Sequence, residues 1–194
     1  MASKSFKVSF TLDEQDAAYF RRLYRTARKH AALENADPII KEVKELVERV
    51  KLAKRVPSFV VEATETLEDL IQMLQDEDYA LPKGVAQEAL GALAYFADPE
   101  DVIPDHIPAL GFLDDAIMMK FVEEEFKHEL WGYRKFRKFR SGAEQRPWTK
   151  VASTRLPKRL EEYRKSVRSQ IKGKKEADAA KARKAQAAGR RSGW

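Results

Sequence analysis

The residues best suited to chemistry are carboxylates gathered in one short, proline-rich stretch. Asp98, Asp101, Asp105, Asp114 and Asp115 all fall within residues 98–115. Ca²⁺ and Mg²⁺ prefer oxygen ligands of this kind, so these five aspartates are candidate metal ligands. Their spacing is not that of an EF-hand, which needs alternating ligands, a central glycine and a terminal glutamate. Apart from such a divalent cation, the sequence predicts no cofactor.

The same stretch has a purely structural interpretation. Pro99, Pro104 and Pro108 each remove a backbone donor and disfavour helix at the preceding residue, so the connection must turn. Aspartates beside prolines suit Asx turns and backbone capping. Asp114 and Asp115 would favour the positive end of a helix that begins there. Turns and caps explain every residue, and the metal site is the alternative hypothesis.

This stretch resembles the signature of the YkvA-like family, the domain of unknown function 1232. The resemblance covers roughly residues 83–122, and the matching positions are Tyr95, Pro99, Asp101, Ile103, Pro104, Asp105, Pro108, Gly111, Asp114 and Asp115. Glu100 and His106 stand where the family is usually apolar, which indicates a connection exposed to water rather than lipid. The resemblance implies a helical hairpin. It brings no activity, substrate or catalytic residue with it.

The second chemical signal is a series of cations in the last third of the chain. The candidates for binding an anionic partner are Arg134, Lys135, Arg137, Lys138, Arg140, Lys158, Arg159, Arg164, Lys165, Arg168, Lys172, Lys174 and Lys175. Cations that neutralise phosphates give salt-dependent binding that is largely independent of sequence. Nucleic acid, an acidic protein and anionic lipid stay open as partners, without rank. Self-association through the acidic part of another copy and a merely solvated tail stay open as well.

Signals for catalysis are weaker. Glu125 and His128 form a Glu-x-x-His pair, but di-iron bundles need two such pairs and two further glutamates. Neither His30 nor His106 has a glutamate three residues before it. The sequence also lacks a phosphate-binding glycine loop, a nucleophile elbow and a paired His-Glu-x-x-His. We therefore predict no catalytic residue and favour a protein that is not an enzyme.

The composition limits both the chemistry and the cellular location that the sequence predicts. The 194 residues include no cysteine, which excludes disulfides, thiolate metal sites and cysteine nucleophiles. The N-terminus lacks the apolar stretch of a secretory signal. The most apolar run, residues 85–97, is shorter than the roughly 20 residues that span a membrane. These features predict a cytoplasmic protein without an integral span, and peripheral membrane association is an alternative.

The charges are divided unevenly along the chain. The net charge is +6, but residues 1–130 carry 16 Lys/Arg against 26 Asp/Glu, and residues 131–194 carry 21 against 5. An acidic first part is thus followed by a strongly basic last third. Such asymmetry points to an anionic partner or to attraction between opposite charges.

Apolar periodicity predicts an all-α protein. Helices are expected at about 11–33, 37–55, 58–74, 82–97, 113–139 and from 157, with a capping box at Thr11 and Glu14. Residues 5–10 are expected as a short extended arm and 141–149 as a linker, and the tail from Lys172 is predicted to be helical only when bound. The result is a bundle of five to six helices centred on the 82–139 hairpin.

Three regions follow from this organisation: an N-terminal helical region (1–80), the YkvA-like hairpin (81–140), and a linker with a basic, partly disordered extension (141–194). Taken together, the features predict a non-enzymatic binding or scaffold module that uses the basic extension on an anionic partner. Two alternative functions stay open: a divalent-metal site in the 98–115 connection, with or without a catalytic role, and peripheral membrane association.

Overall fold

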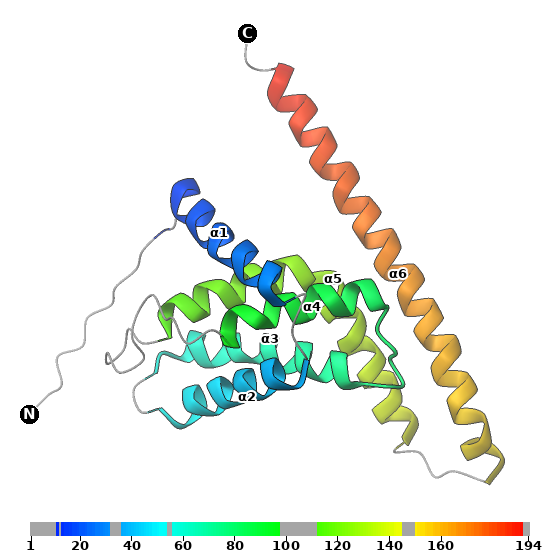
Figure 1. Ribbon diagram of the computed structural model, residues 1–194. Coiled ribbons are helices and arrows are strands. Elements are labelled where there is room, and N and C mark those ends of the chain that lie inside the picture. The colour runs from blue at the N-terminus through cyan, green and yellow to red at the C-terminus, as the bar shows by residue number, and fades with distance from the viewer. Residues whose placement is uncertain are drawn as a thin grey trace, which may run out of the picture.

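The computed structural model describes residues 11, 13–31, 36–53, 56–97, 112–144 and 150–191, and it confirms an all-α bundle within these residues (Figure 1). The elements are α1 (Glu14–Ala31), α2 (Ala36–Leu52), α3 (Ser58–Gln75), α4 (Lys83–Ala94), the 3₁₀ turn η1 (Tyr95–Ala97), α5 (Leu113–Glu144) and α6 (Lys150–Arg191). The predicted arm at 5–10 lies outside the described residues.

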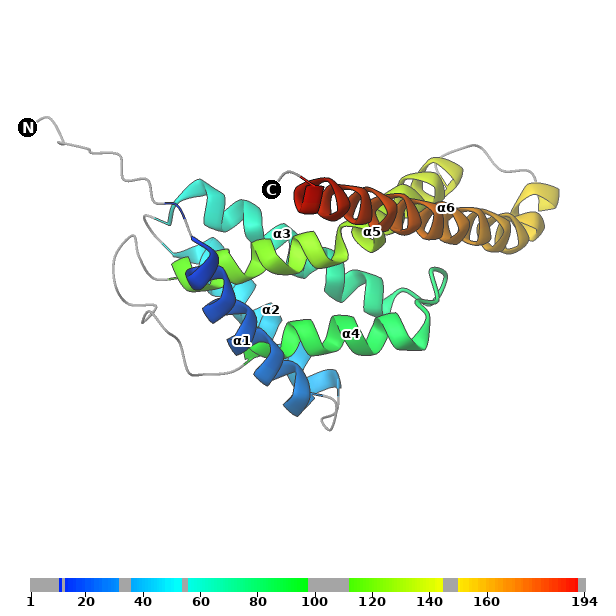
Figure 2. The same cartoon turned by 90° about the horizontal axis from the view of Figure 1, so that it is seen from above.

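Helices α3 and α5 form the middle of the bundle. Their packing against each other is the most extensive in the molecule. Val60, Thr64, Leu67 and Ile71 of α3 are buried, because a 3.6-residue period places these side chains on one face. Helix α2 packs against α3, and α1 crosses α4 on the other side of the bundle (Figure 2).

The predicted hairpin of helices four and five has a different environment from the one expected. Helix α4 packs mainly against α1 and α2, whereas α5 packs mainly against α3 and α6. The buried residues of α4 are Ala89, Gly91, Ala92 and Leu93, so only its second half enters the core. Helices α4 and α5 therefore pack mainly on different neighbours within the bundle.

Helix ends also differ from the predictions in three places. The cap of α1 is Asp13, whose carboxylate accepts hydrogen bonds from the Gln15 and Asp16 backbone N–H groups at 2.7 and 2.9 Å, rather than Thr11. Helix α5 continues to Glu144, so the predicted linker 141–149 begins too early, and Ala143 is buried. Helix α6 begins at Lys150 and runs through Pro157, which costs one intrahelical hydrogen bond.

The last difference concerns the basic tail. The sequence predicted a frayed segment from Lys172, but α6 continues as one helix of 42 residues to Arg191. The physical reason is that extending an existing helix is much easier than starting one, and alanine, lysine and arginine are good helix formers. In Figure 1 the red end of α6 stands clear of the bundle.

None of the helices among the described residues is long and apolar enough to cross a membrane.

Candidate anionic-partner interface

Helix α6 is fixed to the second half of α5 by one buried acid. The Glu129 side chain is almost fully enclosed. Its carboxylate accepts from Arg168 Nη1 at 3.2 Å and from Lys175 Nζ at 2.9 Å. Arg168 and Lys175 are seven residues apart, two turns along the same face of α6, so a single carboxylate on α5 holds both. A buried charge of this kind is stable only when it is paired.

A glycine allows the two helices to approach at this point. A Cβ added to Gly132 would lie 2.5 Å from Ile171 Cδ1 and 3.0 Å from Val167 Cγ1. Val167 and Ile171 are themselves buried. The last helix therefore packs on α5 within the same chain through Val167 and Ile171.

A second group of ion pairs joins α5 to the end of α3. Asp69 on α3 accepts from Arg134 Nε at 2.5 Å and from Arg137 Nη1 at 2.8 Å. The Arg140 guanidinium donates to both carboxylate oxygens of Asp76, at 2.7 and 2.8 Å. It also donates to Asp78 at 3.1 Å. These contacts neutralise most of the basic run of α5 against acids of the bundle.

Asp76 is the most enclosed member of this group. Besides Arg140, it accepts from the Tyr133 hydroxyl at 3.1 Å and from the Tyr79 backbone N–H at 3.0 Å. Burial alone would raise the pKa of Asp76, but the hydrogen bonds and the Arg140 charge outweigh it and lower that pKa below 3.8. Hydrogen bonding to Asp76 likewise raises the pKa of Arg140. The pair therefore stays charged at neutral pH.

Two arginines of α6 cover the turn between α3 and α4. Arg164 donates to the Asp78 carbonyl at 2.9 Å, and Arg168 donates to the Tyr79 carbonyl at 3.3 Å. The Arg168 guanidinium also lies 4.3 Å from the centre of the Tyr79 ring. Carbonyl oxygens left free by the turn thus receive donors from α6.

The structure does not bring the predicted cations together into one open basic surface. Several are engaged by acids of the bundle, namely Arg134, Arg137, Arg140, Arg168 and Lys175. Others contact their own helix, an aromatic ring, an amide or a carbonyl, namely Lys135, Arg159, Arg164, Lys165, Lys172 and Lys174. Lys138 and Lys158 are exposed.

Contact between α6 and α5 ends near Asp178. Its carboxylate lies 3.1 Å from His128 Nε2 and 3.3 Å from Lys127 Nζ. One turn earlier, Lys174 Nζ and Lys135 Nζ lie 4.4 and 4.9 Å from the Trp131 ring centre. Every residue from 179 to 187 is exposed. We call residues 179–191 the free segment of α6.

The free segment is basic and lacks a large apolar side chain. From residue 179 to 191 it contains five cations and no acid: Lys181, Arg183, Lys184, Arg190 and Arg191. Its apolar residues are alanines. A helix without an apolar stripe has no face to bury against a protein core. It can therefore remain in solvent or meet a partner through charge.

The Asp/Pro connection is described only at its two ends. Tyr95 lies in η1, and Asp114 and Asp115 are buried in the first turn of α5, beside Phe112 with φ 67°. The predicted positions Asp98, Pro99, Asp101, Pro104, Asp105, Pro108 and Gly111 lie outside the described residues. In the described part of the chain no three His, Asp or Glu side chains are grouped to hold a metal ion. The metal hypothesis stays a prediction.

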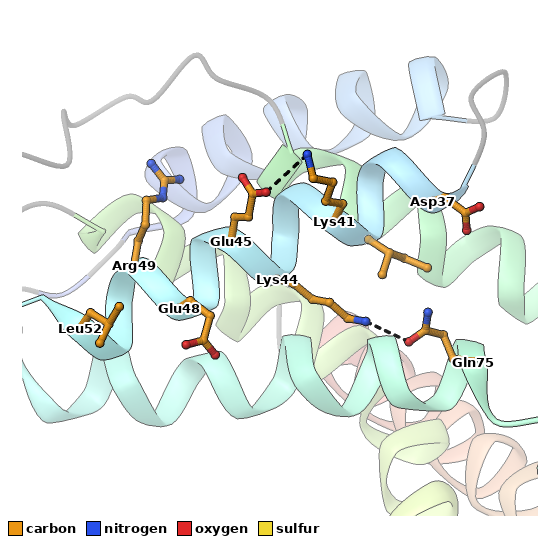
Figure 3. A pocket seen from close by; sticks show the side chains of 9 residues that line it. Asp37, Lys41, Lys44, Glu45, Glu48, Arg49, Leu52 and Gln75 are labelled. Carbon is orange, nitrogen blue, oxygen red and sulfur yellow. Dashed lines mark hydrogen bonds and ion pairs between the residues drawn. The ribbon is translucent and has the colours of Figure 1, made fainter.

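A surface groove of about 660 Å³ lies along α2 and the end of α3 (Figure 3). Lysines and glutamates of α2 line it, with the Lys41–Glu45 pair at 3.5 Å and Lys44 donating to Gln75 at 3.2 Å. Leu52 is 79% exposed at one end. Alternating charges on an exposed helix face are typical of a solvated surface, and this groove carries no arrangement suited to catalysis.

A comparison with family models finds a match over one short segment of the chain. Residues 88–121 match the family described as a protein of unknown function, DUF1232. The predicted resemblance is confirmed for this segment. It spans the second half of α4, the Asp/Pro connection and the start of α5. A comparison with curated proteins and one with solved structures found no match.

The DUF1232 segment includes none of the ion pairs that join α3 to α5 and α5 to α6. Sequence reasoning missed the acids of these pairs, Asp69, Asp76 and Glu129, and it missed Trp131. One signal was present, because Asp69 and Glu129 each interrupt the buried face of an otherwise apolar stripe. An acid at such a position needs a cationic partner.

Proposed function

We propose that this chain is a non-enzymatic binding module that holds an anionic partner with the free segment of α6. The observation that carries the proposal is the exposure of residues 179–187 on a helix that leaves the bundle, together with five cations and no acid in 179–191. Unlike the cations of α5, Lys181, Arg183 and Lys184 lie beyond the last contact with the acidic bundle. Their charge is available to a partner.

The acidic bundle supports this role by fixing where the free segment begins. Glu129 holds Arg168 and Lys175, and Gly132 lets α6 pack closely through Ile171. The docked part of α6 thereby provides a folded start for the helix that follows. A helix already formed before binding loses less conformational entropy when it meets its partner.

The test is retention of the full chain on immobilised heparin, a polyanion, over a NaCl gradient. The variant Lys181→Ala/Arg183→Ala/Lys184→Ala should elute at clearly lower salt than the wild type. The charge-matched control Lys41→Ala/Lys83→Ala/Lys120→Ala removes three exposed cations from α2, α4 and α5. It should elute close to the wild type. If the control shifts as far as the α6 variant, net charge alone governs retention and the proposal fails.

A further inference from the structure

We infer that His128 is a pH-sensitive latch for α6: it holds Asp178 when the imidazole is protonated and frees the last docked turn of α6 when the imidazole is neutral. The inference concerns where the docked part of α6 ends. It goes beyond the proposed function and does not depend on it, because the contact lies before the free segment. It is carried by the position of Asp178, by the enclosure of the imidazole and by the charges around it.

Asp178 is the last residue of α6 that is partly enclosed. Every other residue from 172 to 187 is exposed, whereas Asp178 is half-buried, and its Oδ2 lies 3.1 Å from His128 Nε2. The preceding ion pair on α6 is that of Lys175 with Glu129, almost one turn earlier, at 2.9 Å. Without the Asp178 contact, the docked part of α6 therefore ends at Lys175.

Of the two α5 side chains that contact Asp178, one keeps its charge and the other titrates. Lys127 Nζ lies 3.3 Å from Asp178, and its hydrogen bonds to Glu124 and Asp178 raise the pKa of Lys127, so this side chain stays cationic. Histidine is the side chain whose charge ordinarily changes between pH 5 and 8. The His128 side chain is 17% exposed against 42% for Lys127, so water screens its charge less. The part of the attraction that depends on pH therefore comes from His128.

The charged groups around this contact are nearly balanced. Those within one turn of it are Glu124, Glu125, Lys127 and Glu129 on α5, and Lys174, Lys175, Glu176, Asp178 and Lys181 on α6. On α3, which also packs against α5, Asp69 is engaged by Arg134 and Arg137 farther along α5. Five acids and four lysines leave no excess of positive charge that would oppose protonation of the imidazole.

Protonation adds both a charge and a donor at the contact. The neutral imidazole has one N–H and no charge, whereas the cation donates from both ring nitrogens. Asp178 is ionised over the same range, because its hydrogen bond with Lys127 lowers the pKa of Asp178 below 3.8. The attraction between His128 and Asp178 thus increases as the pH falls from 8 to 5. It is lost again only when the pH falls through the lowered pKa of Asp178.

The experiment is hydrogen–deuterium exchange of the full chain at pH 5.5 and pH 8.0, with each rate divided by that of an unstructured peptide at the same pH. In the wild type, the amides of residues 176–182 should be about two- to fivefold better protected at pH 5.5, the effect of a partly exposed ion pair. In His128→Gln this ratio should be close to one, because glutamine can donate a hydrogen bond but carries no charge. Asp178→Asn should abolish the ratio from the other side of the contact.

Two controls separate the latch from a general effect of pH. His30→Gln removes a histidine from α1 and should keep the wild-type ratio. The amides around Val167, which is fully buried, should be equally protected at both pH values in every variant. A pH effect of the same size around Val167 would mean that the whole of α6, and not its last docked turn, responds, and would overturn the inference.

Two further results would also overturn the latch. One is equal protection of residues 176–182 at the two pH values in the wild type. The other is a wild-type ratio retained in both His128→Gln and Asp178→Asn, because another titrating group would then control the end of α6. Retention on heparin at a single pH tests the proposed function without reference to this ratio, so either can fail alone.

Discussion

At the scale of single residues, three enclosed acids of the bundle, Asp69, Asp76 and Glu129, each accept hydrogen bonds from more than one donor. Asp69 receives two arginines, Glu129 an arginine and a lysine, and Asp76 receives Arg140 together with a tyrosine hydroxyl. Leaving such a carboxylate unpaired is costly, because it loses its hydration without compensation. The arginines suit this role since their planar fork can bind both carboxylate oxygens at once.

The lowered pKa of Asp76 predicts that the free energy of unfolding decreases as the pH falls. Its pKa in the folded protein lies below the ordinary 3.8, so the unfolded chain takes up a proton first as the pH falls. The contribution of Asp76 is complete above about pH 4 and is lost as the pH falls through the lowered folded value.

Urea unfolding of the wild type and of Asp76→Asn at pH 6 and pH 3 measures this contribution. The free energy of unfolding should decrease more for the wild type, because the asparagine does not titrate. Equal decreases in the two proteins would show that other carboxylates govern the acid sensitivity.

Replacing either of two neighbouring tyrosines by phenylalanine should change the free energy of unfolding, but in opposite directions. The Tyr79 hydroxyl is buried and has no hydrogen-bond partner among the described residues, and burial raises the pKa of Tyr79 to about 12. An unsatisfied buried polar group costs about 1–3 kcal/mol. Tyr79→Phe keeps the ring packing on Tyr133 and Phe136, at 5.0 and 5.2 Å between ring centres. It should raise the free energy of unfolding by about 1 kcal/mol.

Tyr133→Phe is the matched comparison, since it removes the hydroxyl that donates to Asp76. It should lower the free energy of unfolding by about 1–2 kcal/mol. Urea titrations at pH 7 measure both variants. A loss of stability in Tyr79→Phe as large as in Tyr133→Phe would mean that the Tyr79 hydroxyl has a partner in solution.

At the scale of elements, the crossing of α5 and α6 decides where the basic helix goes. The sequence predicted a helix from residue 157, but not which helix its buried residues Leu160, Val167 and Ile171 would contact. Gly132 makes the contact with α5 possible, because the absence of a side chain lets Ile171 pack at the α5 backbone. Glu129, one turn earlier, fixes the register through Arg168 and Lys175.

Gly132→Val should therefore weaken the docking of α6. The added carbons collide with Ile171 and Val167, and overpacking of this kind costs about 1–3 kcal/mol. Limited trypsin digestion should cut at Arg164 and Arg168 faster in this variant, because these side chains leave their carbonyl partners. Gly142→Val is the control on the same helix, since nothing lies within 4 Å of a Cβ there. Equal digestion of both variants would contradict the close crossing.

At the scale of the whole molecule, the basic last third of the chain meets the acidic first part in two ways. Several cations of the basic third pair with acids of the bundle within the same chain, and the end of α6 carries further cations beyond the bundle (Figure 1). Net charge alone would therefore overstate the cationic surface that a partner can reach. The proposed binding depends on the free segment and not on the full set of basic residues.

This arrangement predicts a gradient of backbone protection along α6. Amides near Val167 and Ile171 lie in packed helix, whereas those of 179–187 lie in helix whose residues are all exposed. Hydrogen–deuterium exchange with mass spectrometry should show exchange in the free segment at least tenfold faster than around Val167. Uniform protection along α6 would contradict a solvent-exposed helix and point to burial of its end by another copy.

The sequence by itself determined the all-α class, the approximate helix positions, the absence of cysteine chemistry and the DUF1232 segment. These depend on local propensity, apolar period and short motifs, which neighbouring residues specify. Only the tertiary structure decided which acids meet which cations. Asp69 and Arg137 are 68 positions apart, and their contact depends on how α3 packs against α5. The continuation of α6 was likewise decided by docking, because a helix started on α5 extends where an isolated basic segment would fray.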